Sequence, residues 1–166
     1  TVNLSVSGLP TGATASFTPA TVTGSGTSTL AVNTTTATPA GTYTLTITGT
    51  VGALVHSTTV TLVVTVPPNF TISATPASIT VKRGLSGNYT VTITAQNGFT
   101  GTVNLSVAGL PSLVTGTFVP TSVTGSGTST LTVTVNKQQR QGTFPLTITG
   151  TSGTLTHSAA VTLVVN

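Results

Sequence analysis

The sequence contains no Asp, Glu, Cys, Met or Trp, and only four Lys or Arg residues among 166. Without carboxylates, the chain cannot supply the acid–base pair of a glycosidase, the acid of a Ser-His-Asp triad or an oxygen cage for calcium or magnesium. Without cysteine, it has no disulfide, no thiolate nucleophile and no thiolate zinc site. We therefore expect neither an enzyme nor a bound cofactor or metal.

The few basic side chains do not predict a nucleic-acid partner. The net charge of +4 is spread over 166 residues that include only two Tyr and five Phe. Nucleic-acid binders usually present a dense basic stripe with aromatic side chains that stack on bases.

The apolar runs are strand-sized, well short of the ~18 residues of a membrane helix. Residues 1–20 also lack the basic start and apolar core of a signal peptide. We expect no membrane span.

The chain contains 44 threonines, which take the share of the composition that charged residues usually have. Its branched Cβ suits a pleated surface, which favours an all-β fold. Alternation of apolar and polar residues predicts strands, and Asn97-Gly98 predicts a turn. The apolar positions of the strands expected in residues 66–166 are Phe70, Ile72, Ala74; Ile79, Val81; Tyr89, Val91, Ile93, Ala95; Val103, Leu105, Val107; Phe118; Leu131, Val133, Val135; Phe144, Leu146, Ile148; and Leu155 to Val165. Seven or eight strands in about 100 residues predict a Greek-key β-sandwich.

An internal repeat is the strongest signal in the sequence. A shift of 101 positions aligns residues 1–65 with 102–166 without a gap, and roughly 60% of the aligned positions are identical. A period of this length indicates whole domains in tandem. We predict an incomplete unit at 1–65 and a complete unit at 66–166, joined by a short, stiff linker at Pro67-Pro68.

The first unit lacks a counterpart of residues 67–101, which hold three of the predicted strands. Burying one large apolar side chain contributes about 1.5–3 kcal/mol, so the missing strands remove on the order of 10–25 kcal/mol. A whole domain is stable by only ~5–15 kcal/mol. We therefore expect the first unit to need completion, either by upstream residues or by strands donated from a neighbouring copy. Head-to-tail donation between copies would build an open filament.

The repeated segments resemble a known class of module. GFTGTVNLSVAGLP (98–111), FVPTSVTGSGTSTLTV (118–133) and GTFPLTITGTSG (142–153) resemble the Ig-like repeats of large secreted and surface-displayed prokaryotic proteins. The resemblance covers essentially the whole chain. It implies tandem Ig-like Greek-key β-sandwiches that act as stalks, spacers or adhesive units, or that accompany secreted hydrolases. It transfers no functional residues.

Two histidines occupy equivalent positions in the repeat, His56 and His157. The alternation places His157 on the same strand face as Leu155, Val161 and Leu163. A metal site would need further ligands from the same unit, and the sequence offers none. A hydrogen-bonded structural histidine, or one turned outward by a bulge, is the favoured interpretation.

The four charged residues and five glycosylation sequons are the remaining candidate sites. In an Ig-like strand order, Lys82-Arg83 and Lys137/Arg140 lie in loops at one pole, where the chain also leaves at Asn166. This basic pole is either a contact for an anionic polymer or the next subunit, or a set of solubilising loop charges. Asn-X-Ser/Thr sequons are possible glycosylation sites and occur at Asn3, Asn33, Asn69, Asn88 and Asn104.

Together these observations predict a structural protein of the extracellular space or cell surface. The leading hypothesis is a filament or stalk subunit, whose partners are copies of itself or adjacent repeats of the same chain. The alternative is an accessory module of a secreted protein that binds cell-surface polysaccharide or mediates adhesion. Sugar platforms usually need exposed Trp or Tyr, and the chain has no Trp.

Overall fold

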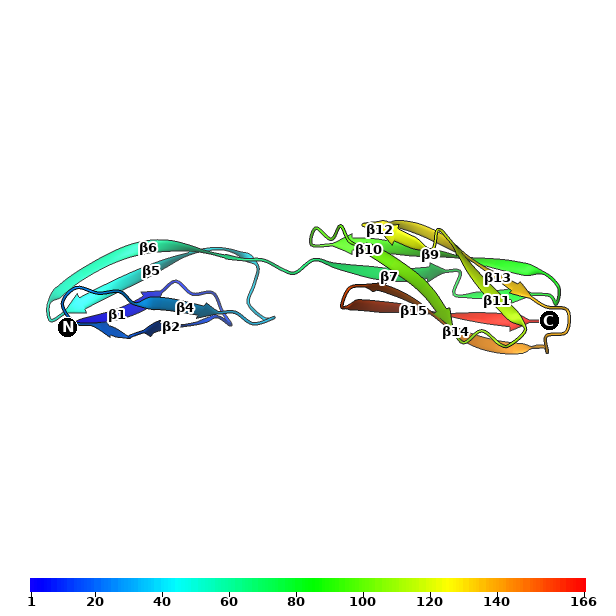
Figure 1. The fold of residues 1–166 in the computed structure, drawn as a ribbon, viewed down its shortest axis with the longest axis horizontal. Helices are drawn as coiled ribbons and strands as arrows, with labels where there is room; N and C mark the ends of the chain where they lie inside the picture. The colour runs from blue at the N-terminus through cyan, green and yellow to red at the C-terminus, as the bar shows by residue number, and fades with distance from the viewer. The chain divides into compact units, whose positions relative to one another are not determined.

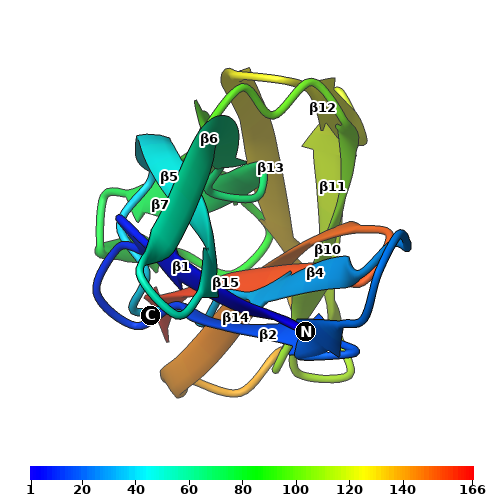
Figure 2. The same cartoon turned by 90° about the vertical axis from the view of Figure 1, so that its left-hand side faces the viewer.

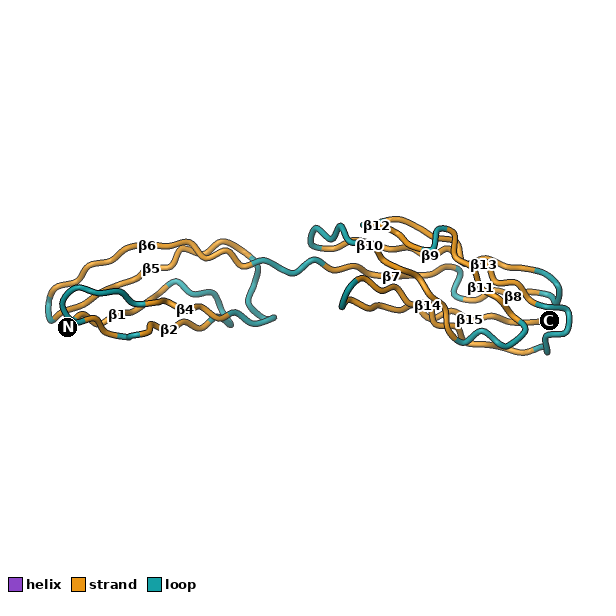
Figure 3. The backbone as a smooth tube through the Cα atoms, viewed as in Figure 1, coloured by secondary structure: helices purple, strands orange, loops and turns teal.

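The computed structural model describes residues 1–166, which form strands and connecting loops without a helix (Figure 3). The chain divides into two compact units, Thr1–Val66 (unit 1) and Pro67–Asn166 (unit 2). The division lies one residue later than the predicted boundary. The fold is all-β, as the threonine content and the alternation predict.

Unit 2 is a sandwich of two sheets. The five-stranded sheet has the order β12-β10-β14-β15-β8, and the second sheet has the order β11-β13-β9-β7. Its strands are β7 (Asn69–Thr75), β8 (Ser78–Val81), β9 (Ser86–Gln96), β10 (Thr102–Ala108), β11 (Val114–Val119), β12 (Ser122–Thr124), β13 (Gly127–Val135), β14 (Gly142–Ser152) and β15 (Leu155–Val165). Figure 2 shows β11 beside β13. All the predicted strands of this unit are present, and β12 is an additional one.

Strand alternation places the core of unit 2 between its two sheets. In β13, Leu131, Val133 and Val135 are buried, while the threonines between them face outward or lie half-buried. The same period of two buries alternate residues of β9 and of the last part of β15. Seventeen of the eighteen buried hydrophobic residues belong to unit 2, and Leu45 is the remaining one. Only unit 2 therefore encloses a core.

Two irregular positions show how the sandwich tolerates its Pro and Gly. Pro145 lies opposite Thr162, whose N–H donates to Ala77 on the other side of β15. The two residues are therefore a non-hydrogen-bonded pair, in which the missing proline N–H leaves no ladder acceptor unpaired. Asn97 and Gly98 both have positive φ, 52° and 75°, in the turn that carries the chain from β9 to β10 in the opposite sheet.

Unit 1 repeats this architecture but lacks part of it. Its sheets have the orders β3-β1-β5-β6 and β2-β4, and Figure 1 shows β5 beside β6. The register is conserved between the units, since Asn3 pairs with Thr50 as Asn104 pairs with Thr151. No strand of unit 1 corresponds to β7, β8 or β9. The strands are β1 (Val2–Ser7), β2 (Thr14–Thr18), β3 (Thr21–Val22), β4 (Thr29–Asn33), β5 (Gly41–Val51) and β6 (Leu54–Val64).

Candidate functional site

An apolar groove lies between the two sheets of unit 1. It has a volume of about 530 Å³, and its apolar lining residues are Val2, Leu4, Phe17, Val22, Leu30 and Ile47. The turn Gly24–Gly26 and Ser28 complete the wall. No titratable side chain lines the groove, so it offers apolar contact and backbone hydrogen bonds but no acid–base chemistry.

Equivalent apolar residues are more exposed in unit 1 than in unit 2. Val60 is 42% exposed, whereas its equivalent Val161 is 4% exposed. Val2 and Val22 are half-buried, whereas their equivalents Val103 and Val123 are buried. The side chains are identical in each pair, so the difference comes from the strands that unit 2 has and unit 1 lacks. The sequence analysis did not predict which residues line the groove. The repeat could have identified them, because they are equivalent to core residues of unit 2.

The predicted basic residues come together at one end of unit 2. Lys82 and Arg83 lie in the turn between β8 and β9, and Lys137 and Arg140 lie in the loop between β13 and β14; all four are exposed. The Gly84 N–H donates to the Val135 carbonyl at 2.8 Å, which joins the two segments. A Cβ added at Gly84 would lie 2.8 Å from Lys137 Cγ.

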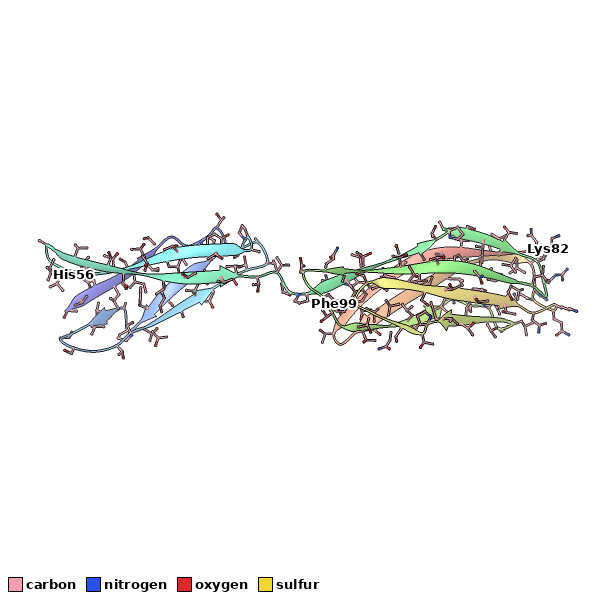
Figure 4. The ribbon with its side chains drawn as sticks, turned by 90° about the horizontal axis from the view of Figure 1, so that it is seen from above. His56, Lys82 and Phe99 are labelled. Carbon is pink, nitrogen blue, oxygen red and sulfur yellow. The ribbon has the colours of Figure 1, made fainter.

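The chain also leaves unit 2 at this basic end. The Arg83 N–H donates to the Asn166 carbonyl at 3.0 Å. Figure 4 shows Lys82 at one end of unit 2 and Phe99 at the other. Since the chain has no Asp or Glu, its own side chains offer these cations no acidic partner. The end can therefore attract anions from outside the molecule.

His157 has a structural environment. His157 Nε2 lies 2.9 Å from Asn69 Oδ1, which also accepts the Phe70 N–H at 2.8 Å. An amide oxygen only accepts, so Nε2 carries the hydrogen and donates. The imidazole also meets the Phe70 ring edge-on, at 4.8 Å between centroids and 86° between planes. These contacts join β15 to β7, as expected of a hydrogen-bonded structural histidine.

His56, the equivalent residue of unit 1, is exposed (Figure 4). Unit 1 has no strand in the place of β7, so it has no counterpart of Asn69 or Phe70 for this imidazole to contact. No group of three potential His, Cys, Asp or Glu ligands lies together in the structure. The two histidines therefore have different environments, although the repeat makes them equivalent in sequence.

The sequons differ in accessibility. Asn3, Asn33, Asn88 and Asn104 are exposed, whereas Asn69 is half-buried and its side-chain oxygen accepts hydrogen bonds from His157 and from the Phe70 N–H.

The structure contains no helix with the length and apolar character needed to cross a membrane.

Comparison with known proteins shows a likeness in fold. No protein-family model matches the sequence, and no curated protein matches it. The crystal structure of the S-layer protein rSbsC aligns over 100% of this chain and 28% of that chain, with a TM-score of 0.50 and 20% identity. This likeness shows the all-β fold.

Two further solved structures give weaker alignments. S-layer protein SbsC domains 4 and 5 align over 76% of this chain and 65% of that chain, with a TM-score of 0.48 and 23% identity. The endo-fucoidan hydrolase MfFcnA4 from glycoside hydrolase family 107 aligns over 99% of this chain and 23% of that chain, with a TM-score of 0.38 and 15% identity. The chain spans less than two thirds of each of these three structures.

Proposed function

We propose that the chain is a non-enzymatic structural part of a cell-surface or extracellular protein, built from Ig-like β-sandwich repeats arranged as a stalk or filament. The observation that carries the proposal is the tandem repetition of one all-β unit, whose fold resembles that of an S-layer protein. Repeated sandwiches extend a chain without requiring a reactive site, and the absence of carboxylates and thiols fits a passive role.

The strand order of unit 2 supports the Ig-like assignment. In Ig-like sandwiches one sheet has the order A-B-E-D and the other contains C-F-G. With β7 as A, β9 as B, β13 as E and β11 as D, one sheet of unit 2 follows the first order. The other sheet follows with β10, β14 and β15 as C, F and G, and β8 and β12 are added at its edges.

Assembly through the open face of unit 1 is part of the proposal. The two sheets of unit 1 end in strands β4 and β6, whose outer edges have no neighbour in the unit. Exposed edges of this kind pair readily with strands from elsewhere. In a stalk the added strands come from an adjacent repeat of the same chain, and in a filament they come from a neighbouring copy.

Surface labelling of source cells tests the proposed location and role. An antibody raised against unit 2 should label intact cells, and brief protease treatment of intact cells should remove the labelling. A cytoplasmic protein probed in parallel should survive the same treatment. Electron microscopy of the released material should show rods or fibres. Labelling that requires cell lysis would refute the surface location.

Binding of an anionic polysaccharide through the basic end is a second candidate function. It is favoured by the gathering of Lys82, Arg83, Lys137 and Arg140 at one end of unit 2. Exposed charges are screened within about 10 Å at 0.1 M salt, so this binding should weaken steeply as salt is added. It predicts retention on a polygalacturonate column at low salt and none on a neutral dextran column.

A charge-removal variant separates this candidate from a solubilising role. Replacing the four basic residues with Gln should abolish retention on polygalacturonate. A matched control, Gln138→Ala with Gln141→Ala, changes the same loop without changing its charge and should be retained as the native chain is. Equal retention of the Gln variant and the native chain would leave the four charges as solubilising groups only.

A further inference from the structure

The segment Pro67–Gly101 contributes to both sheets of unit 2. Strand β9 pairs with β13 from Gly127↔Ile93 to Thr134↔Ser86, and β7 pairs with the other edge of β9. Strand β8 crosses to the opposite sheet and pairs in parallel with β15 through four residue pairs, Thr162↔Ser78 to Val165↔Val81 (Figure 3). One segment therefore extends two edges and closes the sandwich between them.

The edges that correspond to these pairings are open in unit 1. The repeat places Thr61–Val64 of β6 in the position of Thr162–Val165, and β4 in the position of β13. Both β4 and β6 end their sheets. Strand β4 spans 5 residues and β13 spans 9, so the strand is also shorter where its partner is missing.

The groove has the position that side chains of the segment fill in unit 2. Its lining residues Val2, Val22 and Ile47 are equivalent to Val103, Val123 and Ile148. Val103 and Val123 share a buried cluster with Phe70, Ile93 and Phe99, and Ile148 belongs to the cluster that contains Tyr89 and Val91. The shape left open in unit 1 is therefore the shape of the apolar faces of β7 and β9.

The equivalent glycines Gly150 and Gly49 identify one contact that an occupant of the groove would make. A Cβ added at Gly150 would lie 3.3 Å from Phe70 Cε2, so the Phe70 ring packs directly on that glycine. At Gly49 the near atoms would be Val2 Cγ1 at 3.0 Å and Leu4 Cδ2 at 3.8 Å, with no aromatic ring. In unit 1, the Phe of an occupant that is equivalent to Phe70 would therefore pack on Gly49.

Copies of this chain cannot supply the occupant without loss. Residues 1–166 contain one segment of the Pro67–Gly101 type and two units that require one. A copy that donated the segment would expose its own Val103, Leu131 and Leu163, which are now fully buried. The exchange would move the open core from one unit to another, and it would bury no additional apolar surface.

We infer that unit 1 is completed by a three-strand segment of the Pro67–Gly101 type from a further repeat, in the position that Pro67–Gly101 has in unit 2. The inference rests on the proposed array of repeats and identifies the partner of the groove. In unit 2 the turn Asn97–Gly101 leads from β9 into β10, and the Gly101 carbonyl accepts the Gly125 N–H at 2.9 Å. Thr1 is equivalent to Thr102, so an equivalent turn would lead into β1.

A graft of the chain's own segment tests the inference. A second copy of Pro67–Gly101 is fused to Thr1 of the full chain, and amide hydrogen exchange is followed by NMR. We expect exchange of β4 and β6 amides to slow by at least about 100-fold, towards the values of β13 and β15 in the same molecule. Binding of the dye ANS, which reports exposed apolar surface, should fall. The matched control graft carries Phe70→Ser, Val91→Ser and Ile93→Ser in the added copy only, and should give neither change.

Two further measurements cover the other outcomes. The segment added in trans as a free peptide should slow the same amides, which keeps the test valid if the fusion aggregates. Gly49→Val should reduce the slowing that the graft causes, when the grafted variant is compared with the ungrafted Gly49→Val chain.

Two results would overturn the inference. One is a graft and a peptide that both leave the exchange of β4 and β6 unchanged. The other is a native chain whose β4 and β6 amides become protected with concentration as it oligomerises, because a second copy would then be the occupant. Surface labelling of cells depends on neither result, so a failure of the proposed function is seen separately.

Discussion

Tyr89→Phe should change the pH dependence of stability in a way that can be calculated from the structure. Tyr89 is fully buried, and its hydroxyl on β9 donates to the Thr162 carbonyl on β15 at 2.7 Å, which joins the two sheets. Burial raises the pKa of Tyr89 from 10.0 to about 12. Removing the hydroxyl removes both the hydrogen bond and the titration.

The two effects have opposite signs. At neutral pH the substitution loses one buried hydrogen bond and leaves a carbonyl without that partner, which costs about 1–2 kcal/mol. Above pH 10 the unfolded chain releases the Tyr89 proton, while the folded chain holds it until about pH 12. The native chain therefore loses stability as pH rises through this window, by about 2.7 kcal/mol for two pKa units. The variant loses none of it.

Urea denaturation followed by circular dichroism between pH 8 and 12 measures the difference. All other side chains are the same in the two proteins, so their contributions cancel between native chain and variant. The native chain should be more stable at pH 8, the two should match near about pH 11, and the variant should be more stable at about pH 12 by roughly 1 kcal/mol. Stability curves that stay parallel across this range would refute the reasoning.

Three further predictions follow from the composition and from matched positions. Between pH 5 and 2 the melting temperature of unit 2 should change by less than about 3 °C, because no side-chain carboxylate is available to be protonated; a fall of more than 10 °C in calorimetry would contradict this. His157→Ala should lower the free energy of unfolding by about 2 kcal/mol and His56→Ala by less than ~0.5 kcal/mol, measured by urea denaturation, and equal effects would be inconsistent with the contacts of His157. Gly109→Ala should cost more than about 2 kcal/mol in the same assay, since φ is +88° and the new Cβ would press on the Pro145 carbonyl. Gly153→Ala, with φ of +57° and open space around it, should cost only about 1 kcal/mol.

Much of the fold could be predicted because its signals are local or repeated. Alternation in β9, β13 and β15 follows from one face of each strand being buried, so it is visible in the sequence. The gapless repeat likewise shows in the sequence that residues 1–65 have no counterpart of residues 67–101. An Ig-like strand order was enough to predict that the loops of Lys82 and Lys137 lie at the same end, and the two loops are in contact in the structure.

Other features depend on contacts between residues distant in sequence. The hydroxyl of Tyr89 reaches Thr162 across the sandwich, and no local pattern distinguishes this tyrosine from an ordinary core aromatic. The bond between His157 and Asn69 likewise depends on how two sheets face each other. Strand β12 has three residues, too few to show a period of two. The groove of unit 1 becomes apparent only when the exposure of equivalent residues is compared between the two units in the structure.

The parallel pairing of β8 with β15 determines how unit 2 responds to mechanical tension. In a stalk, force enters the unit at Pro67 and leaves at Asn166, close to the end of β15. It loads β7 on β9 first and reaches β8 once β7 has detached. Because β8 and β15 run in the same direction, the two pulls slide the strands along each other in opposite senses. The four residue pairs between them then resist the force together instead of opening one after another. Forced unfolding is governed by the unfolding rate, so this short ladder should control the lifetime of unit 2 under load more than its equilibrium stability does.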